Sequence, residues 1–189
     1  MDTLIIMHGG PATGKTTLGR RLAETLGFPY FSKDGVKEPM FDHVGVPLAW
    51  ETDDVPSGQG MDDAAQTILF YIIKAHLAAH RSCVIDSTFR ATHATRFEDL
   101  QIRYPHLLVQ ILCRTEASEL RKRWQSRADT GERHPGHNDR DLAKRLALVD
   151  IDKVYRHLDI GGLLLTVDTT SQIQESRYTQ LVESINNYI

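Results

Sequence analysis

Long apolar runs are missing from this sequence, because none approaches the roughly 20 residues that a helix needs to cross a bilayer. The first residues also lack a basic stretch followed by a long apolar one, so we expect no secretory signal, no membrane partner and a cytoplasmic location. Cysteine is scarce: Cys83 and Cys113 are the two in the chain, and both stand in apolar segments. We expect two buried, reduced thiols rather than a disulfide.

An excess of basic charge is missing as well. The chain has 22 lysines and arginines against 25 acids, a net charge of −3. Avid, non-specific binding of nucleic acid usually needs a strong basic field, so nucleic acid is a possible partner but not a favoured one. No internal repeat or low-complexity tract is present.

The pattern that is present alternates short apolar runs with helical periodicity. The 189 residues suffice for one domain with a real core, so we expect a single domain over 1–189. The predicted strands are 4–8, 29–32, 83–86, 107–113 and 163–167. The predicted helices are 15–27, 62–80, 92–103, 116–128, 139–158 and a last one that carries the apolar positions 178–189. Strands that alternate with helices predict an α/β fold with three layers, a parallel sheet between helices. The polar stretches 44–60 and 128–138 are predicted loops, and loops of this length are often functional.

A glycine-rich turn, GGPATGKT, directly follows the first predicted strand. Its spacing, Gly-x-x-x-x-Gly-Lys-Thr between a strand and a helix, is typical of a phosphate-binding P-loop, or Walker A motif. Backbone N–H groups and the helix N-terminus would hold phosphate oxygens, Lys15 would reach the β- and γ-phosphates, and the Thr16 hydroxyl would hold Mg²⁺. The residues predicted to bind the nucleotide here are Gly9, Gly10, Pro11, Ala12, Thr13, Gly14, Lys15, Thr16 and Thr17.

A second acid for the metal is expected at the end of another strand. Asp86 ends the apolar run 83–86, where a Walker-B acid would hold Mg²⁺ directly or through water. A turn or helix-capping aspartate is the alternative. The Asn/Thr-Lys-x-Asp signal of guanine recognition is absent, so we expect ATP. Asp168 and Thr169, at the end of the last strand, are candidates for contacts to the base.

Asp34 favours a kinase over a simple ATPase. It follows the second predicted strand, on the sheet edge that carries the P-loop, where a carboxylate can accept the proton of an attacking hydroxyl. Lys37, one helical turn later, can face the same cleft. The alternative is that Asp34 only caps the helix that starts there.

A basic segment supplies candidates for stabilising the charge of the transferred group. Arg123 and Arg127 lie four residues apart on one face of a predicted helix, and Arg133 stands in the loop beyond. We expect these three arginines to belong to a lid over about 117–140 that excludes water. His134 and His137 are too few ligands for zinc, and a lid hinge or a substrate contact is the better interpretation.

Together these residues resemble the P-loop kinases of the nucleoside-monophosphate-kinase-like group. The closest likeness is to small kinases that include polynucleotide 5′-hydroxyl kinase, chloramphenicol phosphotransferase and zeta toxin. Gly9–Thr16, SKD with Asp34, VIDSTF and the arginines occur in the right order. The resemblance implies a P-loop NTPase fold with five parallel strands in the order 2-3-1-4-5 and a helical lid. It adds Thr88 and Arg90 to Asp34, Lys37 and Asp86 as expected substrate-binding residues.

The acceptor is the least determined part of the hypothesis. Lys37 stands where polynucleotide kinase has an arginine, which loses a bidentate phosphate contact. Residues 34–63 hold eight acids and one base, and such an acidic rim favours a small neutral or cationic hydroxyl acceptor. The alternatives are a polynucleotide or nucleotide kinase, a sugar-acid kinase, or an ATPase switch that acts on a protein partner. The sequence leaves monomer and homodimer open.

Overall fold

The computed structural model describes residues 1–44, 59–130, 134–137 and 154–189. Within them, five parallel strands form one sheet in the order β2-β3-β1-β4-β5. The strands are β1 (Thr3–His8), β2 (Tyr30–Ser32), β3 (Cys83–Asp86), β4 (Leu107–Arg114) and β5 (Leu163–Asp168). Both the predicted fold class and the predicted strand order are confirmed.

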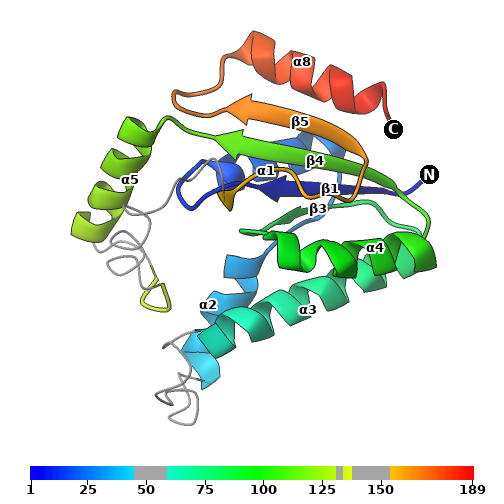
Figure 1. Ribbon diagram of the computed structural model, residues 1–189, viewed down its shortest axis with the longest axis horizontal. Helices are drawn as coiled ribbons and strands as arrows, with labels where there is room; N and C mark the ends of the chain where they lie inside the picture. The colour runs from blue at the N-terminus through cyan, green and yellow to red at the C-terminus, as the bar shows by residue number, and fades with distance from the viewer. Residues whose placement is uncertain (45–58, 131–133, 138–153) are drawn as a thin grey trace.

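Helices cover both faces of this sheet (Figure 1). On one face, α1 (Lys15–Leu26) and α8 (Glu175–Asn186) bury Leu22 and Ile185 against Ile5 of the central strand. On the other face, α3 (Gln59–Ala78) and α4 (Ala94–Arg103) bury Leu69 and Phe97. Strand β1 is buried along its whole length, because it lies in the middle of the sheet and both its faces are covered.

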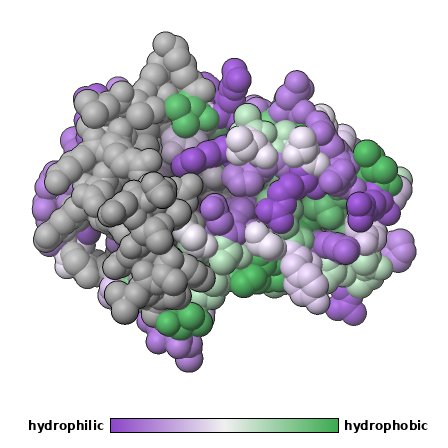
Figure 2. Space-filling model, turned by 60° about the horizontal axis from the view of Figure 1, so that its bottom comes forward, coloured by the Kyte–Doolittle hydropathy of each residue, from purple (hydrophilic) through white to green (hydrophobic). Residues whose placement is uncertain are grey.

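The side of the molecule that carries α3 and α4 presents a mixed surface. Figure 2 shows hydrophilic side chains over most of the described part of this face, with small hydrophobic patches between them. The search for membrane-spanning segments covered the described residues, and no helix among them is long and apolar enough to cross a bilayer.

Two helices lie towards the carboxyl edge of the sheet. Helix α2 (Lys33–Val44) follows β2, and α5 (Ala117–Thr130) follows β4. The sequence pattern gave no bounds for α2, because Gly35 and Pro39 weaken its helical signal. A short 3-10 turn, η2 (Ala91–His93), precedes α4, so the predicted helix 92–103 begins slightly later than expected.

The chain between α5 and β5 departs from the prediction where it is described. Most of the predicted helix 139–158 and of the predicted loop 44–60 lies outside the described residues. The described end of that helix is not helical beyond 154. Gln110 binds the backbone of Leu158 in place of helical partners: its Nε2 donates to the Leu158 and Gly161 carbonyls, and its Oε1 accepts from the Leu158 N–H.

Gln110→Leu should therefore destabilise the protein by about 2–4 kcal/mol, because three backbone groups lose a buried partner. Gln101→Leu is the matched control. It removes one part-buried hydrogen bond, to the Ile160 carbonyl, and should cost about 1 kcal/mol or less. Urea unfolding of both variants measures the difference. Equal losses would contradict this account of the segment.

Candidate active site at the carboxyl edge of the sheet

The loop between β1 and α1 curls tightly around a hollow of backbone N–H groups. Three residues in it have positive φ: Gly9 at 134°, Ala12 at 63° and Gly14 at 79°. A Cβ on Gly9 would lie 2.4 Å from the Cys113 carbonyl oxygen, so only glycine fits there. Such a curl at a helix N-terminus is a site for phosphate oxygens.

Charged groups from three other elements act on Lys15 at the start of α1. Its ammonium is buried and donates to the Gly10 carbonyl at 2.7 Å. Burial lowers the pKa of Lys15, whereas the carboxylates of Asp86 and Asp34 act to raise it and Arg127 to lower it. One residue predicted for the metal (Asp86), one for the acceptor (Asp34) and one for the lid (Arg127) thus lie within electrostatic reach of Lys15.

Thr16 and Asp86 form the arrangement that a magnesium ion would need. The Thr16 hydroxyl donates to Asp86 Oδ2 at 2.7 Å, and the Tyr30 hydroxyl donates to the same oxygen at 2.7 Å. Burial and the Asp86 carboxylate raise the pKa of Tyr30, so its hydroxyl stays protonated as a donor. One carboxylate beside one hydroxyl and a phosphate loop fits Mg²⁺, which takes few protein ligands and completes its shell with phosphates and water. Among the described residues, no group of three or more His, Cys, Asp or Glu could hold a metal.

Asp34 is the second residue of α2, and it is not the cap of that helix. Ser32 takes this role, because its Oγ accepts the Gly35 N–H at 3.0 Å. The capping interpretation of Asp34 is therefore wrong in the structure. Its place in the first turn puts its carboxylate within electrostatic reach of Lys15.

Lys37 lies on the part of α2 that packs against α3. Its ammonium is buried and contacts Asp62 Oδ1 at 3.1 Å, and Lys33 contacts the same oxygen at 2.8 Å. Burial alone would raise the pKa of Asp62, but the two lysines outweigh it and lower that pKa. This cluster carries two positive charges against one negative charge, within the segment that the sequence suggested to be an acidic rim.

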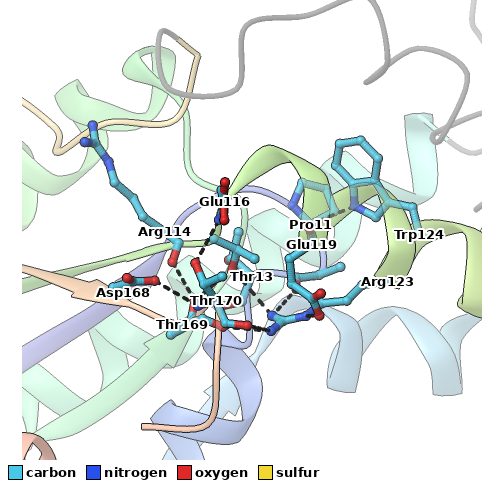
Figure 3. A network of polar contacts seen from close by, with 12 residues as sticks. Pro11, Thr13, Arg114, Glu116, Glu119, Arg123, Trp124, Asp168, Thr169 and Thr170 are labelled. Carbon is cyan, nitrogen blue, oxygen red and sulfur yellow. Dashed lines mark hydrogen bonds and ion pairs between the residues drawn. The ribbon is translucent and has the colours of Figure 1, made fainter.

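The side chains of Arg123 and Trp124 bind α5 to the P-loop by hydrogen bonds (Figure 3). Arg123 donates to the carbonyls of Thr169 and Thr170 at 2.8 and 2.9 Å and pairs with Glu119. Trp124 Nε1 donates to the Pro11 carbonyl at 3.1 Å. Because Nη1 also donates to the Ala12 carbonyl at 3.3 Å, the Arg123 guanidinium lies between the chain after β5 and the P-loop.

The end of β5 is bound to the P-loop through Thr169. The Thr169 hydroxyl lies 2.6 Å from the Thr13 carbonyl and 2.8 Å from the Arg114 carbonyl (Figure 3). Asp168 is exposed and accepts the Thr170 N–H, and this bonding lowers its pKa. Thr169 therefore stands beside the P-loop, and Asp168 precedes it at the exposed end of β5.

The remaining candidates divide between the site and its rim. Arg127 is one helical turn beyond Arg123, and its positive charge acts to lower the pKa of Lys15. Arg133 lies outside the described residues. Thr88 is half-buried after β3. Arg90 is exposed at the start of η2, where its backbone N–H donates to His93 Nδ1.

Sequence reasoning missed a buried polar group on the opposite face of the sheet edge from Asp86. His8 ends β1 with both ring nitrogens unpartnered, and burial, with His157 and Lys15, lowers its pKa to about 3. Ser87 follows β3, and its hydroxyl donates to Gln66 Oε1 on α3. A polar residue directly before the P-loop in an apolar strand was the signal that could have identified this group.

The comparisons with known proteins agree with this geometry. A family model described as an AAA domain matches residues 4–150. This chain belongs to that AAA-domain family. A structure named "putative kinase", from Chloroflexus aurantiacus J-10-fl, is 32% identical with a TM-score of 0.83, over 100% of this chain and 98% of the other. No curated protein matches the chain at a significant level.

More distant structures share the fold of this AAA-domain protein. Kti12 from Chaetomium thermophilum, in complex with ADP-AlF3, has 14% identity and a TM-score of 0.67 over 98% of both chains. Shikimate kinase from Acinetobacter baumannii, in complex with shikimate, has 18% identity and a TM-score of 0.58, over 99% of this chain and 94% of the other. These similarities confirm the P-loop kinase-like fold that the sequence predicted.

If Asp86 serves a metal as the sequence predicts, Asp86→Asn should weaken ATP binding about ten- to hundredfold in the presence of Mg²⁺, because the carboxylate loses its charge. Binding without Mg²⁺ should change little. Tyr30→Phe is the control, since it removes a bond to the same oxygen but keeps the carboxylate. Isothermal titration with and without EDTA measures both. An equal loss under the two conditions would show that Asp86 does not serve a metal.

Proposed function

We propose that this protein is an ATP-dependent kinase that transfers the γ-phosphate to a hydroxyl of a small acceptor, with Asp34 as general base. The observation that carries the proposal is the set of charges around Lys15. The carboxylate of Asp34 on α2 acts to raise the pKa of the buried Lys15 ammonium, and the guanidinium of Arg127 on α5 acts to lower it. A carboxylate in that place can accept the proton of an attacking hydroxyl group.

In the proposed reaction, the nucleotide tail lies in the P-loop curl and Lys15 exchanges its Gly10 carbonyl for phosphate oxygens. A bound Mg²⁺ would be held by Thr16 and Asp86 and would supply charge neutralisation between the β- and γ-phosphates. The acceptor oxygen bonds to the γ-phosphorus as the bond to the β–γ bridging oxygen breaks. Asp34 takes the hydroxyl proton, and ADP leaves.

The lid arginines have distinct proposed roles. Arg127 stabilises charge on the transferred group together with Lys15. Arg123, held by the Thr169 and Thr170 carbonyls, positions the base of α5 and lies beside the place that we propose for the adenine ring. Arg133 keeps its predicted lid role as part of the proposal.

The pairing of the acids changes the argument about the acceptor. Of the acids in 34–63, Asp62 contacts Lys33 and Lys37, while Glu38 and Asp42 contact histidines. The two lysines more than offset the charge of Asp62, so a carboxylated or phosphorylated acceptor is compatible with this part of the described residues. We keep the small hydroxyl compound as the first candidate. Structures named shikimate kinase and sugar kinase share the fold.

The test is transfer of labelled phosphate from γ-labelled ATP to separate pools: polyols, hydroxy acids, nucleoside monophosphates, 5′-hydroxyl oligonucleotides and proteins. Label in either of the first two pools supports the proposal, whereas label in the others supports a nucleotide or polynucleotide kinase or a protein-directed activity. Asp34→Asn should retain ATP binding and lose at least about a hundredfold of transfer, the lower end for loss of a general base.

Asp99→Asn, an exposed aspartate on α4, is the matched control and should transfer like the unaltered protein. Unchanged transfer in Asp34→Asn would remove Asp34 from the mechanism. Hydrolysis of ATP without label in any pool would favour the nucleotide-dependent switch.

A further inference from the structure

Helix α2 presents two different charged faces. Lys33 and Lys37 face α3, where they share Asp62. Asp34, Glu38 and Asp42 follow one another at intervals of four residues, so they lie along another face of the helix. The face that carries the proposed general base therefore continues, turn by turn, into two further carboxylates.

The turn His134–His137 is docked on this second face. His134 Nε2 lies 2.9 Å from Asp42 Oδ1, and His137 Nε2 lies 3.0 Å from Glu38 Oε1. The His134 ring also meets the Phe41 ring edge to face at 5.5 Å. A Cβ on Gly136 would lie 3.1 Å from Phe41 Cγ, so the turn packs closely against the helix.

The turn has its own internal bonds, and these fix how His134 binds. Its Nδ1 accepts the Gly136 N–H at 3.1 Å, and its carbonyl accepts the His137 N–H at 3.0 Å. Since Nδ1 is an acceptor, the proton is on Nε2, which donates to Asp42. The contact therefore needs only a neutral histidine and a carboxylate oxygen, and any carbonyl oxygen in the same place would serve.

The docking joins the two helices that carry the proposed chemistry. The turn follows the end of α5, which bears Arg127, and it contacts α2, which bears Asp34 (Figure 1). Near its middle, α5 is bound to the P-loop through Arg123 and Trp124. The described chain is thus fixed on both sides of Lys15.

We propose that His134 and His137 are positioning residues, which hold the lid turn on Glu38 and Asp42 so that Arg127 and Asp34 face each other across the transferred phosphate. This inference rests on the proposed function. It deepens that function by assigning the two histidines to an intramolecular contact rather than to zinc or to the acceptor. Neither histidine touches the reacting atoms.

The test compares binding of MgADP with binding of MgADP plus aluminium fluoride, a mimic of the transferred phosphate that needs no acceptor. In the unaltered protein the mimic should bind more tightly than MgADP alone. Asp42→Leu, Glu38→Leu and His134→Phe should each reduce this preference about tenfold, on the scale of one hydrogen bond to a charged group. MgADP affinity and Tm should stay unchanged, because the P-loop and the core are untouched.

Asp42→Asn supplies the conservative rescue. Its amide oxygen can accept from His134 Nε2, so the preference should stay within about threefold of the unaltered protein. Asp63→Leu, at an exposed carboxylate on α3, is the matched control for adding a leucine to this surface.

Leucine variants that lower Tm but keep the full preference for the mimic would overturn the positioning role, while the kinase proposal would stand. Asp42→Asn as damaging as Asp42→Leu would overturn the neutral-histidine contact. An unaltered protein with no preference for the mimic would count against the proposed phosphate transfer itself, and the positioning role would fall with it.

Discussion

The hydrogen bond between Thr16 and Asp86 is the contact on which the rest of the site depends. It joins the first turn of α1 to the end of β3, and so fixes the P-loop against the neighbouring strand in the sheet. The loop can take this position because Gly9 has no side chain that would clash with the Cys113 carbonyl, and because Gly14 and Ala12 adopt positive φ. With the loop fixed in this way, Lys15 is buried within electrostatic reach of Asp86 on β3, Asp34 on α2 and Arg127 on α5, and we propose that phosphate oxygens bind there.

The two helices beyond the sheet edge are held by different kinds of contact. Helix α5 is fastened by hydrogen bonds from Arg123 and Trp124 to carbonyl groups, which do not depend on a ligand. Helix α2 is held from two sides, by charge pairs with Asp62 on α3 and by hydrogen bonds with the turn His134–His137. Partly exposed contacts of this kind each contribute little to the free energy of unfolding. Their main effect is to fix the orientation of α2. In the proposed reaction the acceptor must enter and leave. A P-loop with fixed surroundings and a helix α2 held by weak contacts suit that requirement.

Much of this arrangement could be predicted from the sequence, because it follows from strong local patterns. The strands, the P-loop and the placement of Thr16 and Asp86 at one edge of the sheet follow from apolar runs, from the spacing of the glycines and from the rule that parallel strand ends share one edge. The strand order is implied by the resemblance to P-loop kinases. What could not be predicted depends on tertiary partners. Ser32 rather than Asp34 caps α2, Lys37 turns towards Asp62, and Arg123 binds carbonyl groups beside β5, and none of these choices is encoded in spacing. The acidic composition of 34–63 also misled, because counting charges does not reveal that Glu38, Asp42 and Asp62 are paired.

The central claim is that a carboxylate of α2 faces the outermost phosphate of a nucleotide held in the P-loop. A crystal structure with Mg²⁺ and a non-hydrolysable ATP analogue tests it most directly. The account predicts the analogue's triphosphate inside the curl of Gly9–Thr16, with an Asp34 carboxylate oxygen about 5–6 Å from the γ-phosphorus, which leaves room for one acceptor oxygen between them. A triphosphate in that curl with Asp34 turned away, while the turn His134–His137 remains docked on α2, would contradict it.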